Sequence, residues 1–139
     1  MPRRRKPIDR KVATRIVPQR EDKDCTISAL SMWTGETYED VLRVACGIDD
    51  EGAADGLYTT QLIAAADALG IQLKRKRRFN AEVDSGIMYL VHRRDEWTRH
   101  VAVLKNGVVI DTNDTVWFDV KKFLRYYQWA PRMLFVETE

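Results

Sequence analysis

The chain reads Gln19-Arg20-Glu21-Asp22-Lys23-Asp24-Cys25-Thr26-Ile27-Ser28-Ala29-Leu30 at the point where its first hydrophobic helix is expected to begin. Gln19 stands one short loop before Cys25, and apolar residues continue from Cys25 until Gly35, a helix-ending residue. A thiol at a helix N-terminus is more easily ionised, because the helix dipole favours negative charge there. The stretch therefore predicts a nucleophilic cysteine at the start of a buried helix.

A second apolar stretch begins at His100, turns at Asn106-Gly107 and returns to Asp111. A two-residue Asn-Gly loop is typical of a tight hairpin, which pairs Ala102 with Asp111 and His100 with Asn113. Cross-strand partners and residues two apart share a face of the sheet, so the imidazole is expected beside both polar side chains. Asp111 lies diagonal to it and Asn113 directly opposite. Either could hold the ring nitrogen that does not face sulfur.

These side chains together indicate acyl transfer through a thioester. Cys25 would be the nucleophile and His100 its base, with Asp111 as the orienting group. The Gln19 amide and the backbone N–H of Cys25 could stabilise the oxyanion that forms when a carbonyl is attacked. With water as acceptor the outcome is hydrolysis of a peptide or isopeptide bond. An amine acceptor would make the protein an acyl transferase.

Composition narrows the class of protein. The chain has 139 residues, 45% of them hydrophobic, which suits one domain with its own core. Two cysteines are too few for a disulfide framework, and both are interpreted as thiols. We expect a flexible basic arm over residues 1–15 and one domain over 16–139. Neither a secretory signal nor a membrane-spanning run occurs, so a cytoplasmic location without membrane association is expected.

The order of the elements predicts an α+β fold. Three helices are expected first, from Asp24 to Thr34, from Thr37 to Gly47 with a capping box, and from Thr59 or Thr60 to Leu69. One further helix is expected from about Asp119 to Trp129. Mostly antiparallel strands fill the second half, with the first helix against the sheet; they are predicted at 71–79, 86–91, 100–104, 108–112 and 133–136.

The same residues resemble the papain-like fold in its short bacterial form, that of the bacteriocin-processing peptidases that remove double-glycine leader peptides. Gln19 through Asp24-Cys25 resembles the nucleophile segment of that family, and His100-Val101-Ala102-Val103-Leu104 with Ile110-Asp111 resembles its histidine and aspartate strands. Similar segments from Gly56 to Gly70 and in the last helix and strand extend the resemblance over about residues 16–136. It implies a cysteine peptidase with Cys25 as nucleophile, His100 as general base, Asp111 as its orienter and Gln19 as oxyanion donor.

The chain departs from that family at two neighbouring positions. Thr26 follows the cysteine where the family usually has Gly, and Thr112 follows the aspartate where it usually has Pro. Neither change replaces a reacting atom. The connection from histidine to aspartate is also shorter than usual, which leaves Asn113 or Asp114 open as the third member. A peptide or protein substrate is expected, with no cofactor.

Several other residues indicate a function less strongly. Cys46 is expected in the core, and His92 at the surface near a loop. Zinc is not expected, because close ligand pairs are lacking. Trp97 and Trp117 could shape a cleft, although packing is the commoner role. The basic run from Lys74 to Arg78, with Arg3–Lys6, could bind nucleic acid or an acidic peptide as a non-catalytic module; a solvated strand edge that resists pairing with other chains is favoured over this.

Overall fold

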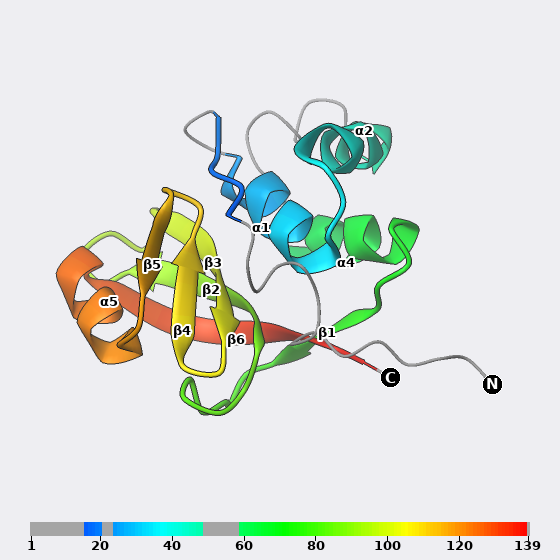
Figure 1. Cartoon of the computed structure of the whole chain (residues 1–139). Helices are drawn as coiled ribbons and strands as arrows, with labels where there is room; N and C mark the ends of the chain where they lie inside the picture. Colours follow the sequence, from blue (N-terminus) through cyan, green and yellow to red (C-terminus); the bar gives the residue numbers. More distant parts are fainter. Residues whose placement is uncertain (1–15, 21–23, 49–58, 139) are drawn as a thin grey trace.

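The computed structural model describes residues 16–20, 24–48 and 59–138, and the expected basic arm lies outside this range. Within it the chain forms four helices and a six-stranded sheet, which confirms the predicted α+β fold (Figure 1). The helices are α1 (Cys25–Thr34), α2 (Tyr38–Ile48), α4 (Thr59–Ala68) and α5 (Val120–Tyr127). The strands are β1 (Leu73–Lys76), β2 (Gly86–His92), β3 (Arg99–Lys105), β4 (Val108–Asp111), β5 (Thr115–Trp117) and β6 (Trp129–Glu137).

The sheet is antiparallel throughout, in the order β1-β6-β2-β3-β4-β5. β6 therefore lies between β1 and β2, and the β3–β4 hairpin lies on the other side of β2. Lys105 pairs with Val108 and Ala102 with Asp111, as the Asn-Gly turn predicts. The ladder ends at Asp111, so Asn113 does not pair with His100. The register thus places Asp111 diagonal to the imidazole.

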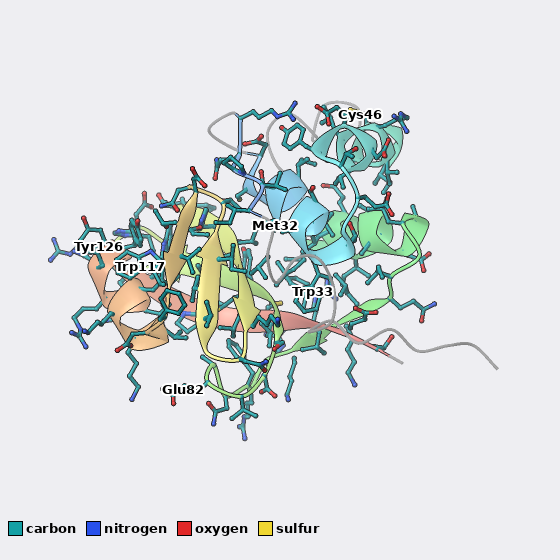
Figure 2. All side chains as sticks on the ribbon, viewed as in Figure 1. Met32, Trp33, Cys46, Glu82, Trp117 and Tyr126 are labelled. Atoms are coloured by element: carbon teal, nitrogen blue, oxygen red, sulfur yellow. The ribbon has the colours of Figure 1, made fainter. Side chains whose placement is uncertain are left out.

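Two hydrophobic cores lie on opposite faces of the sheet, because side chains alternate along a strand. Val101 and Val103 of β3 pack against α1, α2 and α4, whereas Ala102 and Leu104 pack toward α5. Figure 2 shows Met32 and Trp33 of α1 on the helical side of the molecule, far from Trp117 and Tyr126 at the end that carries α5. Among the described residues, no helix is long and apolar enough to cross a membrane.

Local chemistry sets most of the boundaries. The Thr37 hydroxyl accepts from the Asp40 N–H at 3.1 Å, which confirms the cap predicted for α2. Gly35 ends α1 with φ of 84°, a left-handed conformation that suits glycine. Several details differ from the prediction. The sequence does not predict β5, β1 is shorter than the expected strand at 71–79, and β6 begins four residues before the expected start at 133. The last helix ends at Tyr127 because Gln128 turns left-handed, with φ of 61°. Trp129 consequently begins β6.

The basic run from Lys74 to Arg78 is exposed and includes most of β1, which is an edge strand. Charged side chains on an edge strand oppose pairing with other chains. This placement agrees with the interpretation favoured from the sequence, a solvated strand edge that resists pairing with other chains. Its binding to nucleic acid or to an acidic peptide stays a prediction.

Candidate active site

Cys25 begins α1 and is half-buried. The preceding residue, Asp24, holds this helix end in place: its backbone oxygen accepts from the N–H of Ile27 at 3.0 Å. Its side chain is buried and accepts from the backbone N–H of Arg20 at 2.9 Å and from the hydroxyl of Tyr38 in α2. Asp24 therefore ties the start of α1, where Cys25 lies, to the preceding segment and to the neighbouring helix α2.

His100, near the start of β3, contacts the carboxylate predicted for it. Its Nε2 lies 2.6 Å from Oδ1 of Asp111, and the two side chains are 15% and 2% exposed. The same Oδ1 accepts from the backbone N–H of Thr112 at 2.8 Å. A buried carboxylate that accepts these bonds fixes the orientation of the ring. Nδ1 is then the nitrogen available to sulfur.

The electrostatics of the imidazole favour its charged form. Burial by itself would lower the pKa of His100, but hydrogen bonds to Asp111 and to the Cys25 thiol and the charges of both groups outweigh it, raising the pKa to about 10. The ring is therefore an imidazolium at neutral pH, lying between sulfur and carboxylate. A charged ring can give its proton to a leaving group during acyl transfer.

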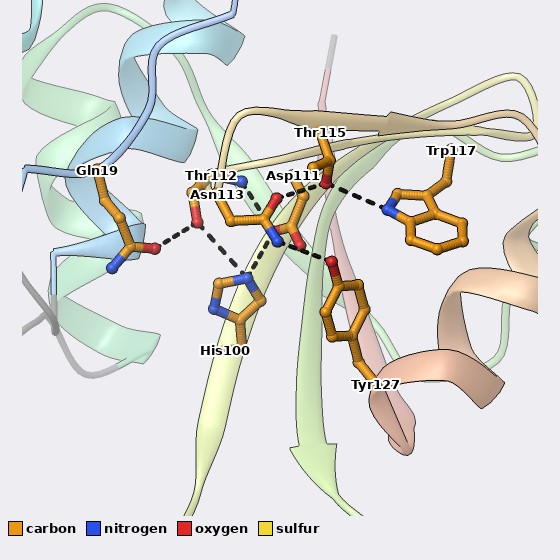
Figure 3. A network of polar contacts seen from close by, with 8 residues as sticks. All are labelled: Gln19, His100, Asp111, Thr112, Asn113, Thr115, Trp117 and Tyr127. Carbon is orange, nitrogen blue, oxygen red and sulfur yellow. Dashed lines mark hydrogen bonds and ion pairs between the residues drawn. The ribbon is translucent and has the colours of Figure 1, made fainter.

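Gln19 reaches this group through Thr112, 93 residues away in sequence. The Thr112 hydroxyl donates to the Gln19 amide oxygen at 2.7 Å, and the Gln19 backbone N–H donates to the Thr112 carbonyl at 2.8 Å. Figure 3 shows the amide oxygen directed at Thr112 and the amide nitrogen turned the other way, with the imidazole just below Thr112. Cys25, His100, Asp111 and Gln19 thus come together from the first helix, two strands and the segment before the helix.

The alternatives to Asp111 lie apart from the imidazole. Asn113 donates to the hydroxyl of Tyr127 at 3.0 Å and accepts from Thr115 (Figure 3). Asp114 occupies the following turn with φ of 70°. His100 instead contacts Asp111, so Asp111 is the carboxylate that the fold supplies to the ring.

The other residues considered from the sequence have different partners, although the ring of His92 meets the edge of Trp129. Cys46 belongs to α2 and packs against the helical core. His92 accepts from the backbone N–H of Arg94 at 3.2 Å. Trp97 is 82% exposed, and Trp117 packs against the rings of α5. No cluster of three or more potential metal ligands occurs in the described part of the chain.

The sequence does not indicate that Thr112 and Trp129 contact the imidazole of His100. The Trp129 ring stacks on the imidazole of His100, with 5.3 Å between centroids and 11° between planes. The sequence predicts Trp129 at the end of a helix, whereas it begins β6. Pro131 is the available signal, because Ala130, the residue directly before it, is disfavoured in helical backbone, so the helix is expected to end before that point.

Comparison with known proteins bears on the fold. Neither a protein-family model nor a curated protein sequence matches the chain. Among solved structures, it is similar to the peptidase domain of Streptococcus ComA, a bi-functional ABC transporter involved in a quorum sensing pathway. The TM-score is 0.59 at 15% identity, over 89% of this chain and 98% of that domain.

The chain has the papain-like fold. The resemblance inferred from its motifs is therefore confirmed at the level of the fold. The similarity spans nearly the whole of the matched peptidase domain and includes both the helical side and the sheet. At this identity it is the fold that is shared.

Proposed function

We propose that the protein is a cysteine peptidase that hydrolyses a peptide bond through Cys25, His100 and Asp111. The observation that carries the proposal is the position of His100, whose Nε2 lies 2.6 Å from Asp111 and whose ring interacts with the Cys25 thiol. A buried imidazole between a thiol and a carboxylate is the arrangement that thiol acyl transfer requires. The peptidase-domain fold supports the same assignment.

In this mechanism the Cys25 thiolate attacks the peptide carbonyl carbon, and the carbonyl electron pair moves to oxygen. The backbone N–H of Cys25 and the Gln19 amide donate to that oxyanion. The imidazolium of His100 then gives its proton to the departing amine as the C–N bond breaks, leaving a thioester. Neutral His100 next takes a proton from water, which attacks the thioester. Collapse of the second oxyanion releases the acid and restores the thiolate.

The direct test compares proteome digests made by the wild type and by Cys25→Ala. We expect new peptide termini with the wild type and none above background with Cys25→Ala, measured by mass spectrometry. Cys46→Ala is the matched control, since it removes the other thiol, and its cut sites should equal those of the wild type. Identical termini from the wild type and Cys25→Ala would refute the proposal.

Hydrolysis and transfer share every step up to the thioester. Adding a small primary amine to the digest separates them: a hydrolase gives free carboxyl termini, whereas a transferase gives amide adducts. We expect free carboxyl termini to predominate. If amide adducts predominated, the protein would be an acyl transferase in which the same three residues keep their proposed roles.

A further inference from the structure

Thr112 is fully buried and lies where the site's polar groups meet. Its backbone N–H donates to Asp111, its carbonyl accepts from the backbone of Gln19, and its hydroxyl donates to the Gln19 amide oxygen. The same hydroxyl oxygen is 3.5 Å from Nε2 of His100. One residue thus contacts the acid, the imidazole and the amide of the site (Figure 3).

The direction of these hydrogen bonds follows from which groups carry a proton to donate. A threonine hydroxyl has one proton, and the amide oxygen of Gln19 can only accept, so that proton is committed to Gln19. Toward His100 the hydroxyl can then offer only a lone pair. Nε2 consequently faces two acceptors, the Asp111 carboxylate and the Thr112 hydroxyl, and this environment holds its proton in place.

The bond to the amide oxygen also decides which way the Gln19 amide faces. An amide rotated by 180° would place its NH₂ group against the hydroxyl, and the hydroxyl would have to accept instead of donate. Donation from Thr112 selects the orientation with oxygen inward, which turns the NH₂ group away from Thr112, as an oxyanion donor requires.

We infer that Thr112 is a positioning residue for the oxyanion donor: its hydroxyl locks the Gln19 amide in the donating orientation. The inference rests on the proposed function and is specific to this chain. The resembling family usually has proline here, which offers neither a hydroxyl nor a backbone N–H. A chain with threonine can therefore orient the glutamine through a contact that proline cannot make.

The test compares Thr112→Val, which removes the hydroxyl at nearly constant shape, with Thr112→Ser, which keeps it. Two reagents report on different steps. Acylation of Cys25 by p-nitrophenyl acetate passes through an oxyanion, with nitrophenolate leaving as the thioester forms. Alkylation by iodoacetamide displaces iodide from a saturated carbon, so no oxyanion forms.

In Thr112→Val we expect acylation to slow by roughly ten- to a hundredfold, less than the 10²–10³ typical of deleting a donor outright. Alkylation should stay within about twofold. Thr112→Ser should recover most of the lost acylation rate. In a Gln19→Ala background, Thr112→Val should cause little further loss, because the two residues act through one interaction.

The inference is overturned if Thr112→Val acylates like the wild type, if it slows both reagents equally, or if its effect adds fully to that of Gln19→Ala. Thr112→Ala provides the same comparison should the valine variant fail to fold. Failure of the proposed function would be seen separately, as a wild type that cuts no peptide while these acylation ratios still hold.

Discussion

The charge on His100 follows from groups in contact with it. Asp111 lies at one ring nitrogen and the Cys25 thiol interacts with the ring, while Trp129 stacks on its face and helps to bury it. Burial disfavours the cation, but the hydrogen bonds and charges of Asp111 and Cys25 outweigh it, and the pKa of His100 rises to about 10. The imidazolium is therefore the resting form at neutral pH.

This pKa predicts an upper limit for peptide cleavage. The proton that the leaving amine needs is present below the pKa of His100, so cleavage should fall as pH rises through about 10. Alkylation of Cys25 should not fall there, because it needs the thiolate and no acid. Asp111→Asn removes a group that raises the pKa, and the cleavage limit should move down by about one to three pH units.

The measurement is the pH profile of cleavage beside that of iodoacetamide labelling, for both proteins. An unchanged upper limit in Asp111→Asn would show that the carboxylate does not maintain the charge on the ring.

The sequence predicts some of these contacts and not others. Asp111 could be placed beside His100 because the Asn-Gly turn fixes a two-residue loop and hence the register. The choice between Asp111 and Asn113 could not be made, since it depends on where the ladder ends. The stacked Trp129 could not be found at all without knowing that β6 pairs with β2.

At the scale of the element, α1 is fixed at both ends by different means. Its N-terminus is held by the buried Asp24, which binds Arg20 and Tyr38. Its C-terminus depends on Gly35, whose N–H bonds to the Ser31 carbonyl at 3.0 Å while its φ is 84°. A residue with a Cβ is strained in that conformation, whatever space surrounds it.

Gly35→Ala should therefore destabilise the protein by about 1–2 kcal/mol. No atom lies within 4 Å of the added Cβ, so the cost is one of backbone conformation alone. Gly47→Ala is the matched control: it also meets nothing within 4 Å, but it lies in the last turn of α2 without a left-handed backbone, where alanine is favoured by up to about 0.5–1 kcal/mol. Urea unfolding should give opposite signs for the two variants. The same sign for both would contradict this account of the helix end.

The helices were predicted well because their signals are local. The cap at Thr37 and the glycine after α1 each act within a few residues. The end of α5 escaped prediction because Gln128, which has no strong preference for left-handed backbone, takes that conformation there. β5 escaped because a three-residue strand owes its existence to its partner β4.

At the scale of the whole molecule, the sheet is joined by β6, the last strand, which lies between β1 and β2. Its approach to β2 is close at Gly86, where an added Cβ would lie 2.3 Å from the carbonyl oxygen of Phe135. Backbone cannot give way as a flexible side chain can. The close pairing of β2 with β6 therefore requires glycine at this position.

Gly86→Ala should cost roughly 3 kcal/mol, at the upper end of overpacking, because β2 and β6 must separate. Val83→Ala, three residues earlier and 67% exposed, should change the free energy of unfolding by about 0.5 kcal/mol or less. Both values are measurable by urea denaturation. A Gly86→Ala variant as stable as the wild type would mean that β2 and β6 tolerate a wider spacing.

The bond between Gln19 and Thr112, 93 residues apart, also has a bearing on biosynthesis. A ribosome must deliver both hairpin strands before the sulfur can meet its imidazole, and the strand that carries Trp129 emerges later still. The nascent polypeptide thus passes most of its translation with an unactivated thiol. Chain order thus keeps the proposed active site incomplete until late in synthesis.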